Sequence, residues 1–92
     1  MQPLVTIVTT YYNRAGFLKE TLRSLQLQTM TDWEAILWND GSTDNSVEIA
    51  REMAEMDSRF RIFGGERIGH AQSLVRSCAE AQGRYIGVLD SD

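Results

Sequence analysis

Apolar and polar positions follow two different periods along the chain, and together they predict four strands separated by three helices. Short runs rich in β-branched and aromatic residues predict strands at 4–9, 33–38, 59–63 and 85–89. Between them, apolar residues recur every three or four positions, which is typical of helices that bury one face. No internal repeat or proline-rich linker divides the sequence, so residues 1–92 are expected to form one domain.

The order of these elements along the chain predicts an α/β fold. A strand alternates with a helix throughout, which favours a three-layer, Rossmann-like arrangement with a mostly parallel four-stranded sheet and helices on both faces. In open sheets of this kind, ligands bind beyond the carboxyl ends of the strands. The residues that follow the strands are therefore the most informative part of the sequence. They are 10–13, 39–42, 64–70 and 90–92.

Several residues are expected to fix the ends and the buried faces of the helices. Asn13 can cap the first helix, which continues to about Gln28. Asn45 and Glu48 have the spacing of a capping box for the second helix. Gly83 can provide a left-handed end for the third helix. An apolar stripe predicts the buried face of that third helix, and it consists of Ala71, Leu74, Val75 and Cys78.

The composition excludes several classes of protein. An apolar fraction of 42% excludes a disordered tail, and 13 acidic against 9 basic side chains argue against nucleic acid as the main partner. Cys78 is the only cysteine, which excludes an internal disulfide and a multi-thiolate metal site and favours a reducing compartment. No apolar run reaches the ~18 residues of a membrane span, and the N-terminus lacks the pattern of a signal peptide. A cytoplasmic protein is expected, with the inner face of the membrane as an alternative for a longer chain.

The predicted strand ends carry carboxylates in place of the usual phosphate-binding glycines. Nothing after the first strand matches G-x-G-x-x-G or a Walker A loop. Asp90 and Asp92 are hard oxygen ligands one residue apart, which suits Mg²⁺ or Mn²⁺ bound together with a diphosphate. Tyr12 can stack on a base, and Asp40 can accept a hydrogen bond from a ring N–H. Together these residues predict a site for a nucleoside diphosphate and a divalent cation.

These motifs occur in one order and with gaps that resemble the N-terminal, nucleotide-binding half of a family 2 glycosyltransferase with the GT-A fold. Residues 5–14 (VTIVTTYYNR) are similar to the opening strand of the family and its T-Y-N-R turn, and residues 18–25 together with Gln28-Thr29 resemble its first helix. Residues 39–44 (NDGSTD) are similar to D-D-G-S-T-D, and residues 89–92 (LDSD) to the D-x-D metal motif. The resemblance covers nearly the whole chain.

The resemblance implies transfer of a sugar from a nucleoside diphosphate sugar, with a preference for uridine, to an acceptor with inversion at the anomeric carbon. It implies that Thr10, Tyr12 and Asp40 contact the base. Asp90 and Asp92 would serve the ribose, the diphosphate and the Mg²⁺ or Mn²⁺ ion, with Asp92 as the main metal ligand. The acidic residue that deprotonates the acceptor hydroxyl is expected beyond Asp92, so the 92 residues would hold the donor site without the catalytic base.

Three further positions complete the candidate set. Asn13 belongs to the matching turn after the first strand and is expected to contact the nucleotide. Where the family often reads N-x-G, this chain has Arg67-Ile68-Gly69, and Arg67 or His70 can supply the diphosphate contacts. His70 can equally cap the third helix or face water. Asn39 replaces the first aspartate of the usual pair, which removes one negative charge beside Asp40.

A second class of function stays open on the sequence alone. A chain with this fold can be a non-catalytic nucleotide-binding or structural module, in which no transfer occurs. The acceptor is not specified and can be a sugar, a polysaccharide, a lipid or a protein. By analogy with the family, the fourth strand lies at an edge of the sheet. An open edge favours pairing between chains, so self-association is expected.

Overall fold

A computed structural model describes residues 2–89 of the chain, and its strands form one parallel sheet. The strand order is β3-β2-β1-β4, and every described pair runs parallel. The strands are β1 (Val5–Tyr11), β2 (Trp33–Asn39), β3 (Phe60–Gly64) and β4 (Tyr85–Val88). The helices are α1 (Ala15–Leu27), α2 (Ser46–Met56) and α3 (His70–Ala79). The predicted alternation is confirmed, and β4 lies at an edge of the sheet as expected.

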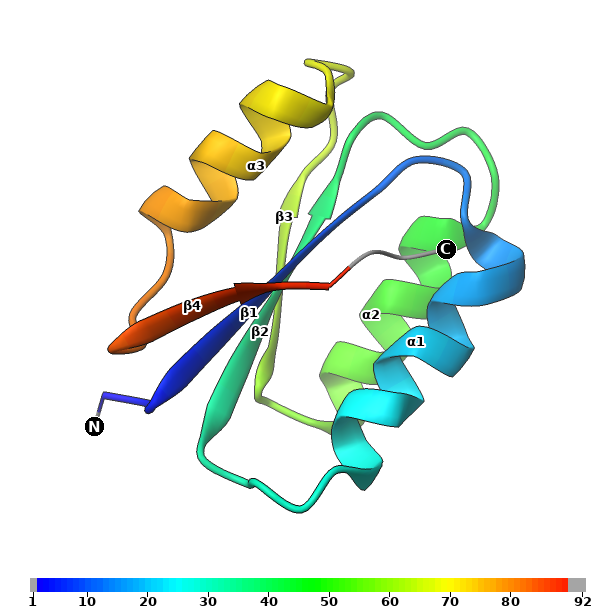
Figure 1. The fold of residues 1–92 in the computed structure, drawn as a ribbon. Coiled ribbons are helices and arrows are strands. Elements are labelled where there is room, and N and C mark those ends of the chain that lie inside the picture. Colours follow the sequence, from blue (N-terminus) through cyan, green and yellow to red (C-terminus); the bar gives the residue numbers. More distant parts are fainter. Residues whose placement is uncertain (1, 90–92) are drawn as a thin grey trace.

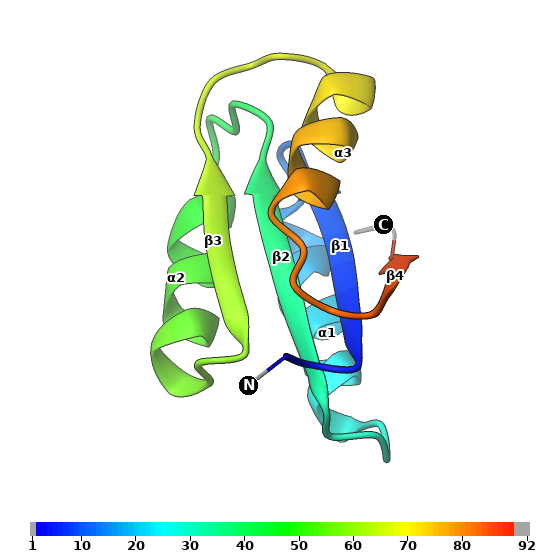
Figure 2. The ribbon, with the colours of Figure 1, turned by 90° about the vertical axis from the view of Figure 1, so that its left-hand side faces the viewer.

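The helices cover both faces of the sheet, which confirms the three-layer α/β prediction. Helices α1 and α2 lie side by side on one face, and α3 lies on the other (Figures 1 and 2). Each strand connects to the next through a helix, so all the strands point in the same direction and their carboxyl ends share one edge of the sheet. This edge carries the loops that follow β1, β2 and β3.

The two faces of the sheet differ in chemistry. The face under α1 and α2 is the apolar core, where Leu18 and Leu22 are fully buried against Ala35 and Leu37 of β2. On the face under α3, Thr6 and Glu34 are buried and hydrogen-bonded to each other. Alternation along each strand produces this division, because successive side chains of a strand point to opposite faces.

The predicted buried face of α3 is wrong. The helix buries Ser73 and Ser77, whereas Val75 of the apolar stripe is 65% exposed and Cys78 is only half-buried. Short serine side chains let the helix approach the sheet closely, and the Ser77 hydroxyl donates to the Ser73 carbonyl, 2.6 Å away. The stripe Ala71, Leu74, Val75 and Cys78 therefore does not form the contact with the sheet.

The connection from α3 to β4 is bound to the same face of the sheet, and it corrects the role of Gly83. Glu34 accepts a hydrogen bond from the Gln82 N–H, and Thr6 Oγ1 accepts one from the Gly83 N–H. A Cβ on Gly83 would lie 2.6 Å from the Thr6 nitrogen, so glycine allows the close approach of the backbone to β1. Gly83 does not end α3, which stops at Ala79.

Candidate functional site

The carboxyl edge of the sheet gathers most of the predicted site residues. We define the carboxyl edge as residues 10–14, 39–46 and 64–70, the segments that follow or end β1, β2 and β3. Strand β4 ends at the same edge, because it runs parallel to β1 and the Leu89 N–H donates to the Val8 carbonyl at 3.0 Å. The predicted metal ligands Asp90 and Asp92 lie outside the described residues, so their role stays a prediction.

Side chains fasten the first loop of the carboxyl edge to the second. The Asn13 side-chain oxygen accepts hydrogen bonds from the Thr43 N–H at 2.7 Å and the Asp44 N–H at 3.2 Å. The Ser42 hydroxyl in turn accepts the Asn13 N–H at 3.0 Å. Asn13 has a φ of 52°, a left-handed conformation that asparagine tolerates better than most residues. The predicted cap on α1 is therefore wrong, because the Asn13 side chain is committed to the second loop.

Asp44 joins the beginnings of the two helices of the apolar layer. Its carboxylate accepts the N–H and the hydroxyl of Ser46 at 2.9 and 2.5 Å, and the Ala15 N–H at 3.3 Å. The Ser46 hydroxyl accepts the Arg14 N–H at 2.9 Å. The hydrogen bonds from Ser46 are the main reason why the pKa of Asp44 lies below its ordinary value. This pair positions both helices at the carboxyl edge, and sequence reasoning missed it.

The predicted capping box of α2 is also wrong. Asn45 occupies the N-cap position, but its side chain makes no capping hydrogen bond. The residue before it, Asp44, binds the first helical N–H instead. The signal was present in the sequence as the run Ser-Thr-Asp, since aspartate oxygens readily bind N–H groups two residues further on.

Asn39 supports the turn that follows β2. Its side-chain oxygen accepts the Ser42 N–H at 2.8 Å. Asn39 is buried, with 8% of its surface exposed. A carboxylate in the same place would offer the same acceptor oxygen. Asparagine therefore preserves the turn while leaving Asp40 as the charged member of the motif.

Asp40 fixes the third loop against the second. It is buried, and one carboxylate oxygen accepts the N–H groups of Ile68 and Gly69 at 2.8 and 3.0 Å. Burial raises the pKa of Asp40, but the backbone donors of Ile68 and Gly69, the Ser73 hydroxyl and the nearby Arg67 cation outweigh it, so the pKa lies below its ordinary value. Asp40 is therefore a carboxylate at neutral pH, with one oxygen committed to the loop.

Tyr12 and Arg67 lie beside this carboxylate. The Tyr12 side chain is exposed at the carboxyl edge, whereas its neighbour Tyr11 is buried in the core, where burial raises the pKa of the phenol to about 12. The Arg67 guanidinium carbon lies 3.5 Å from the centre of the Tyr12 ring, and Arg67 Nε is 3.7 Å from the second oxygen of Asp40. The structure thus brings together an aromatic face, a buried carboxylate and a cation.

Thr10 and His70 form a second contact across the edge. The Thr10 hydroxyl lies 3.2 Å from Nδ1 of His70, the first residue of α3. His70 is exposed and makes no side-chain cap on its own helix. The predicted exposure of His70 is confirmed, and the alternative of a helix cap is wrong. The contact with Thr10 was not predicted.

The described residues hold no other candidate metal site and no membrane span. Between residues 2 and 89, no group of three or more His, Cys, Asp or Glu side chains is placed to hold a metal ion. None of the three helices in this part of the chain is long and apolar enough to cross a membrane. Asp90 and Asp92 stay the predicted metal ligands, and carboxylate oxygens are the hard ligands that Mg²⁺ and Mn²⁺ prefer.

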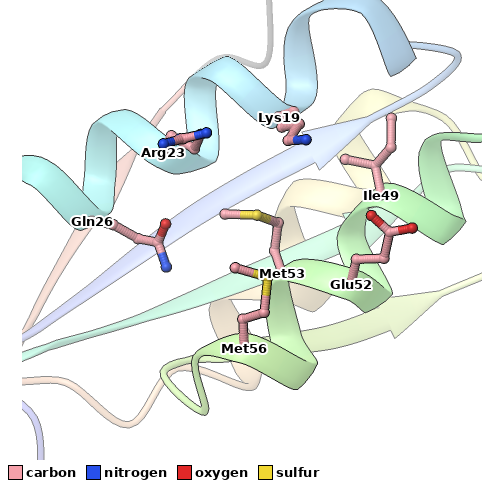
Figure 3. A pocket seen from close by; sticks show the side chains of 7 residues that line it. All are labelled: Lys19, Arg23, Gln26, Ile49, Glu52, Met53 and Met56. Atoms are coloured by element: carbon pink, nitrogen blue, oxygen red, sulfur yellow. The ribbon is translucent and has the colours of Figure 1, made fainter.

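A groove of about 200 Å³ lies elsewhere, between α1 and α2 (Figure 3). Lys19 and Arg23 of α1 line it on one side, and Glu52, Met53 and Met56 of α2 lie across from them, with Gln26 and Ile49 completing the lining. This groove shares no residue with the carboxyl edge. Its lining mixes opposite charges with thioethers and presents no convergent set of phosphate or base contacts.

Residues 6–92 match the sequence model described as Glycosyl transferase family 2. The glycosyltransferase EpsJ of Bacillus subtilis is 40% identical to the chain over 92 residues, which are 100% of this chain and 27% of EpsJ. The chondroitin synthase of Pasteurella multocida is 38% identical over 90 residues, which are 98% of this chain and 9% of that protein. The chain thus spans only about a quarter of EpsJ, and less of the synthase.

Solved structures show the same fold. A mannosyltransferase of Pyrobaculum calidifontis, solved with GDP-Man and Mn²⁺, superposes with a TM-score of 0.89 at 26% identity, over 100% of this chain and 28% of that one. TarS of S. aureus superposes with a TM-score of 0.87 at 22% identity, over 97% of this chain and 27% of that one. The second likeness concerns the fold alone. The order of strands and helices described above is therefore one that glycosyltransferases use.

Proposed function

Because the chain belongs to glycosyl transferase family 2, we propose that it forms the donor site of an enzyme that transfers a sugar from a nucleoside diphosphate sugar to an acceptor. The observation that carries this proposal is the cluster of Tyr12, Asp40 and Arg67 at the carboxyl edge, where open α/β sheets bind their ligands. The chain covers about a quarter of EpsJ, so transfer itself is proposed for a longer protein that includes these residues.

The base would use Tyr12 and Asp40. The Tyr12 ring offers an aromatic face, and such faces contribute about 1–3 kcal/mol per stacked base. One Asp40 oxygen already accepts two backbone N–H groups, which leaves the second oxygen as the acceptor for the base. A single acceptor suits the one ring N–H of uracil, which supports the preference for uridine. Guanine, the base of the donor bound by the Pyrobaculum mannosyltransferase, presents two adjacent N–H donors and is the alternative that the test below includes.

The diphosphate would lie between the third loop and the end of β4. Asp90 and Asp92 are the proposed ligands of Mg²⁺ or Mn²⁺, in keeping with the Mn²⁺ bound to the Pyrobaculum enzyme. A divalent cation, when bound there, neutralises the charge that grows on the departing diphosphate. His70 and Thr10 lie at the same edge and would contact the phosphates or the ribose. Asn13 would act indirectly, by holding the loop that carries Asp40.

The base that deprotonates the acceptor stays a prediction for residues beyond Asp92, and the acceptor is not identified. A cytoplasmic location also stays a prediction, which rests on the single cysteine of the chain. A purely structural module with the same fold would keep the loop contacts of Asn13 and Asp44 but would not bind a nucleotide at the carboxyl edge. Nucleotide binding therefore separates the donor site from a structural module, and sugar transfer by the longer protein separates it from a non-catalytic nucleotide-binding module.

Calorimetric titration of the 92-residue chain with UDP and GDP, in the presence of Mg²⁺ or Mn²⁺, tests the proposal. We expect saturable binding of UDP that is about tenfold weaker or worse after Asp40→Asn, since one charged hydrogen bond is worth about 1.5–3 kcal/mol. The matched control is Asp32→Asn, the same change on an exposed residue of the loop before β2, remote from the carboxyl edge. Tighter binding of GDP than of UDP would contradict the uridine preference. Binding that both asparagine variants retain equally would contradict the donor site.

A further inference from the structure

The guanidinium of Arg67 occupies the place at the carboxyl edge that the proposed function gives to a base. Its carbon lies 3.5 Å from the centre of the Tyr12 ring, the separation of a flat group stacked on an aromatic face. Its Nε lies 3.7 Å from the second oxygen of Asp40, the one that does not accept the Ile68 and Gly69 N–H groups. A planar group with an aromatic neighbour on its face and a carboxylate on its edge is in the same environment as a stacked base whose ring N–H binds Asp40.

The contacts of the Arg67 side chain are of a kind that a ligand can replace. The distance of 3.7 Å to Asp40 is too long for a hydrogen bond, so the pair is held by charge alone. The side chain is 55% exposed, and exposed ion pairs and exposed cation–π contacts are both weak. A base N–H at ordinary hydrogen-bond distance would satisfy the same oxygen better.

The backbone of Arg67, in contrast, is fixed. A Cβ on Gly41 would lie 2.8 and 2.9 Å from the Arg67 nitrogen and Cα, so the second loop packs directly against this residue. The next two N–H groups, those of Ile68 and Gly69, bind Asp40. Only the part of the Arg67 side chain beyond Cβ is free to move, while the backbone and Cβ stay fixed at the carboxyl edge.

We infer that Arg67 is a built-in mimic of the nucleobase, which fills the base position between Tyr12 and Asp40 in the nucleotide-free chain and is displaced when a base enters. This inference rests on the proposed donor site. Displacement leaves the cation tethered beside the bound nucleotide, where the negative charge of the diphosphate attracts it. Arg67 therefore weakens the binding of a base alone. When the ligand carries phosphates, the attraction between the displaced cation and the diphosphate offsets this loss of affinity.

The test compares uridine with UDP, because only UDP offers phosphates to the displaced cation. Both are titrated into the 92-residue chain and its variants, with Mg²⁺ present, and binding is followed by the chemical shifts of backbone amides. Arg67→Ala keeps the Cβ that packs on Gly41 and removes the guanidinium. We expect it to bind uridine about three- to tenfold more tightly, as expected when a weak competitor that fills most of the sites is removed. We expect its gain for UDP to be smaller or reversed.

Two variants serve as controls. Arg84→Ala removes an arginine beside another exposed tyrosine, Tyr85, at the opposite end of the sheet, and should leave both affinities unchanged. Arg67→Lys keeps the positive charge but not the planar group, so it should gain affinity for uridine and keep the contribution of the charge to UDP binding.

A direct spectroscopic signature accompanies the affinities. In the free chain, the side-chain proton signals of Arg67 should be shifted upfield by the ring of Tyr12, and Tyr12→Leu should abolish this shift. Added uridine should return the signals toward ordinary values in the wild-type chain. If Arg67 instead forms a second wall on which the base stacks, the signals stay upfield and Arg67→Ala weakens uridine binding. That outcome overturns the inference.

The failures of the inference and of the donor site are distinguishable. If UDP binds the wild-type chain at the carboxyl edge while Arg67→Ala leaves uridine binding unchanged or weaker, only the role of Arg67 is wrong. If neither UDP nor uridine shifts any amide at the carboxyl edge in any variant, the donor site is wrong and the inference about Arg67 falls with it.

Discussion

Glu34 is the polar centre of the sheet face under α3, and its removal is a sharp test of how that face is held together. Its carboxylate accepts the Thr6 hydroxyl at 2.6 Å, the Gln82 N–H at 2.7 Å and Arg61 at 2.8 Å. Only 5% of the residue is exposed. Burial raises the pKa of Glu34, but the donors Thr6, Gln82 and Arg61 outweigh it, and the pKa lies below its ordinary value.

The expected cost of Glu34→Ala follows from what each donor loses. The Thr6 hydroxyl is fully buried and keeps no other acceptor, and the Gln82 N–H loses its partner. The Arg61 side chain is 29% exposed and can turn to water, so its part is small. Two lost bonds at about 1 kcal/mol each, with a cavity in addition, predict a loss of about 2–3 kcal/mol. Glu34→Gln should cost less, about 1–2 kcal/mol, because the amide oxygen can replace one carboxylate oxygen as acceptor. It still costs some stability, because the amide nitrogen is a donor and must face another donor in place of the second oxygen.

Urea unfolding followed by tryptophan fluorescence measures both variants. The matched control is Glu55→Gln, an exposed residue of α2 that should change the free energy of unfolding by less than about 0.5 kcal/mol. An unchanged m value keeps the comparison on stability alone. A Glu34→Ala chain as stable as the Glu55→Gln chain would refute the view that this network fixes α3 and β4 to the sheet.

Three more predictions concern the stability of the chain at low pH, the loop that follows β2, and the exposed edge strand β4. Hydrogen bonds from Arg59 are the main reason why the pKa of Asp57 is lowered to about 2, so the carboxylate stabilises the fold fully above the unfolded pKa near 3.8 and loses this effect as the pH falls toward 2. In urea unfolding, the free energies of unfolding of wild type and Asp57→Asn should differ at pH 7 and converge near pH 2. A difference that stays constant with pH would contradict this. Gly41→Ala places a Cβ 2.8 Å from the Arg67 nitrogen at a φ of 76°. It should lower the free energy of unfolding by about 2 kcal/mol and shift the NMR signal of the Arg67 backbone amide, and an unchanged amide spectrum would refute the tight packing. Along β4, Tyr85, Ile86 and Val88 are 59%, 49% and 58% exposed, so sedimentation of the 92-residue chain should show mass rising with concentration, less so for Val88→Lys; a strict monomer would contradict this.

The fold was predictable because its signals are local and repeated. Each strand and each helix carries its own period in the apolar residues, and the alternation of the two periods specifies a parallel sheet. The element ends differ from the prediction by only one or two residues, except that α3 is shorter than the expected stop at Gly83 implied. Which face of α3 is buried was not predictable in this way. Ser73 and Ser77 are polar in any local pattern, yet both are fully buried where α3 packs against β1 and β2.

The location of the candidate site was predictable from the sequence, but most of the contacts within it were not. Parallel strands put residues 10–13, 39–42 and 64–70 at one edge, and the structure places Tyr12, Asp40 and Arg67 together there. Hydrogen bonds between loops far apart in the sequence were not predictable from local spacing. Asn13 has the sequence of a helix cap, but its partners Thr43 and Asp44 lie thirty positions away and are known only once the sheet is built.

The measurement that tests the donor site most directly is a map of backbone amide signals during titration with UDP and Mn²⁺. We expect UDP to shift the signals of Tyr12, Asp40 and Arg67, and paramagnetic Mn²⁺ to broaden the signals nearest Asp92 first. Perturbations confined to the groove between α1 and α2 (Figure 3), or absent from the carboxyl edge at saturating UDP, would contradict it.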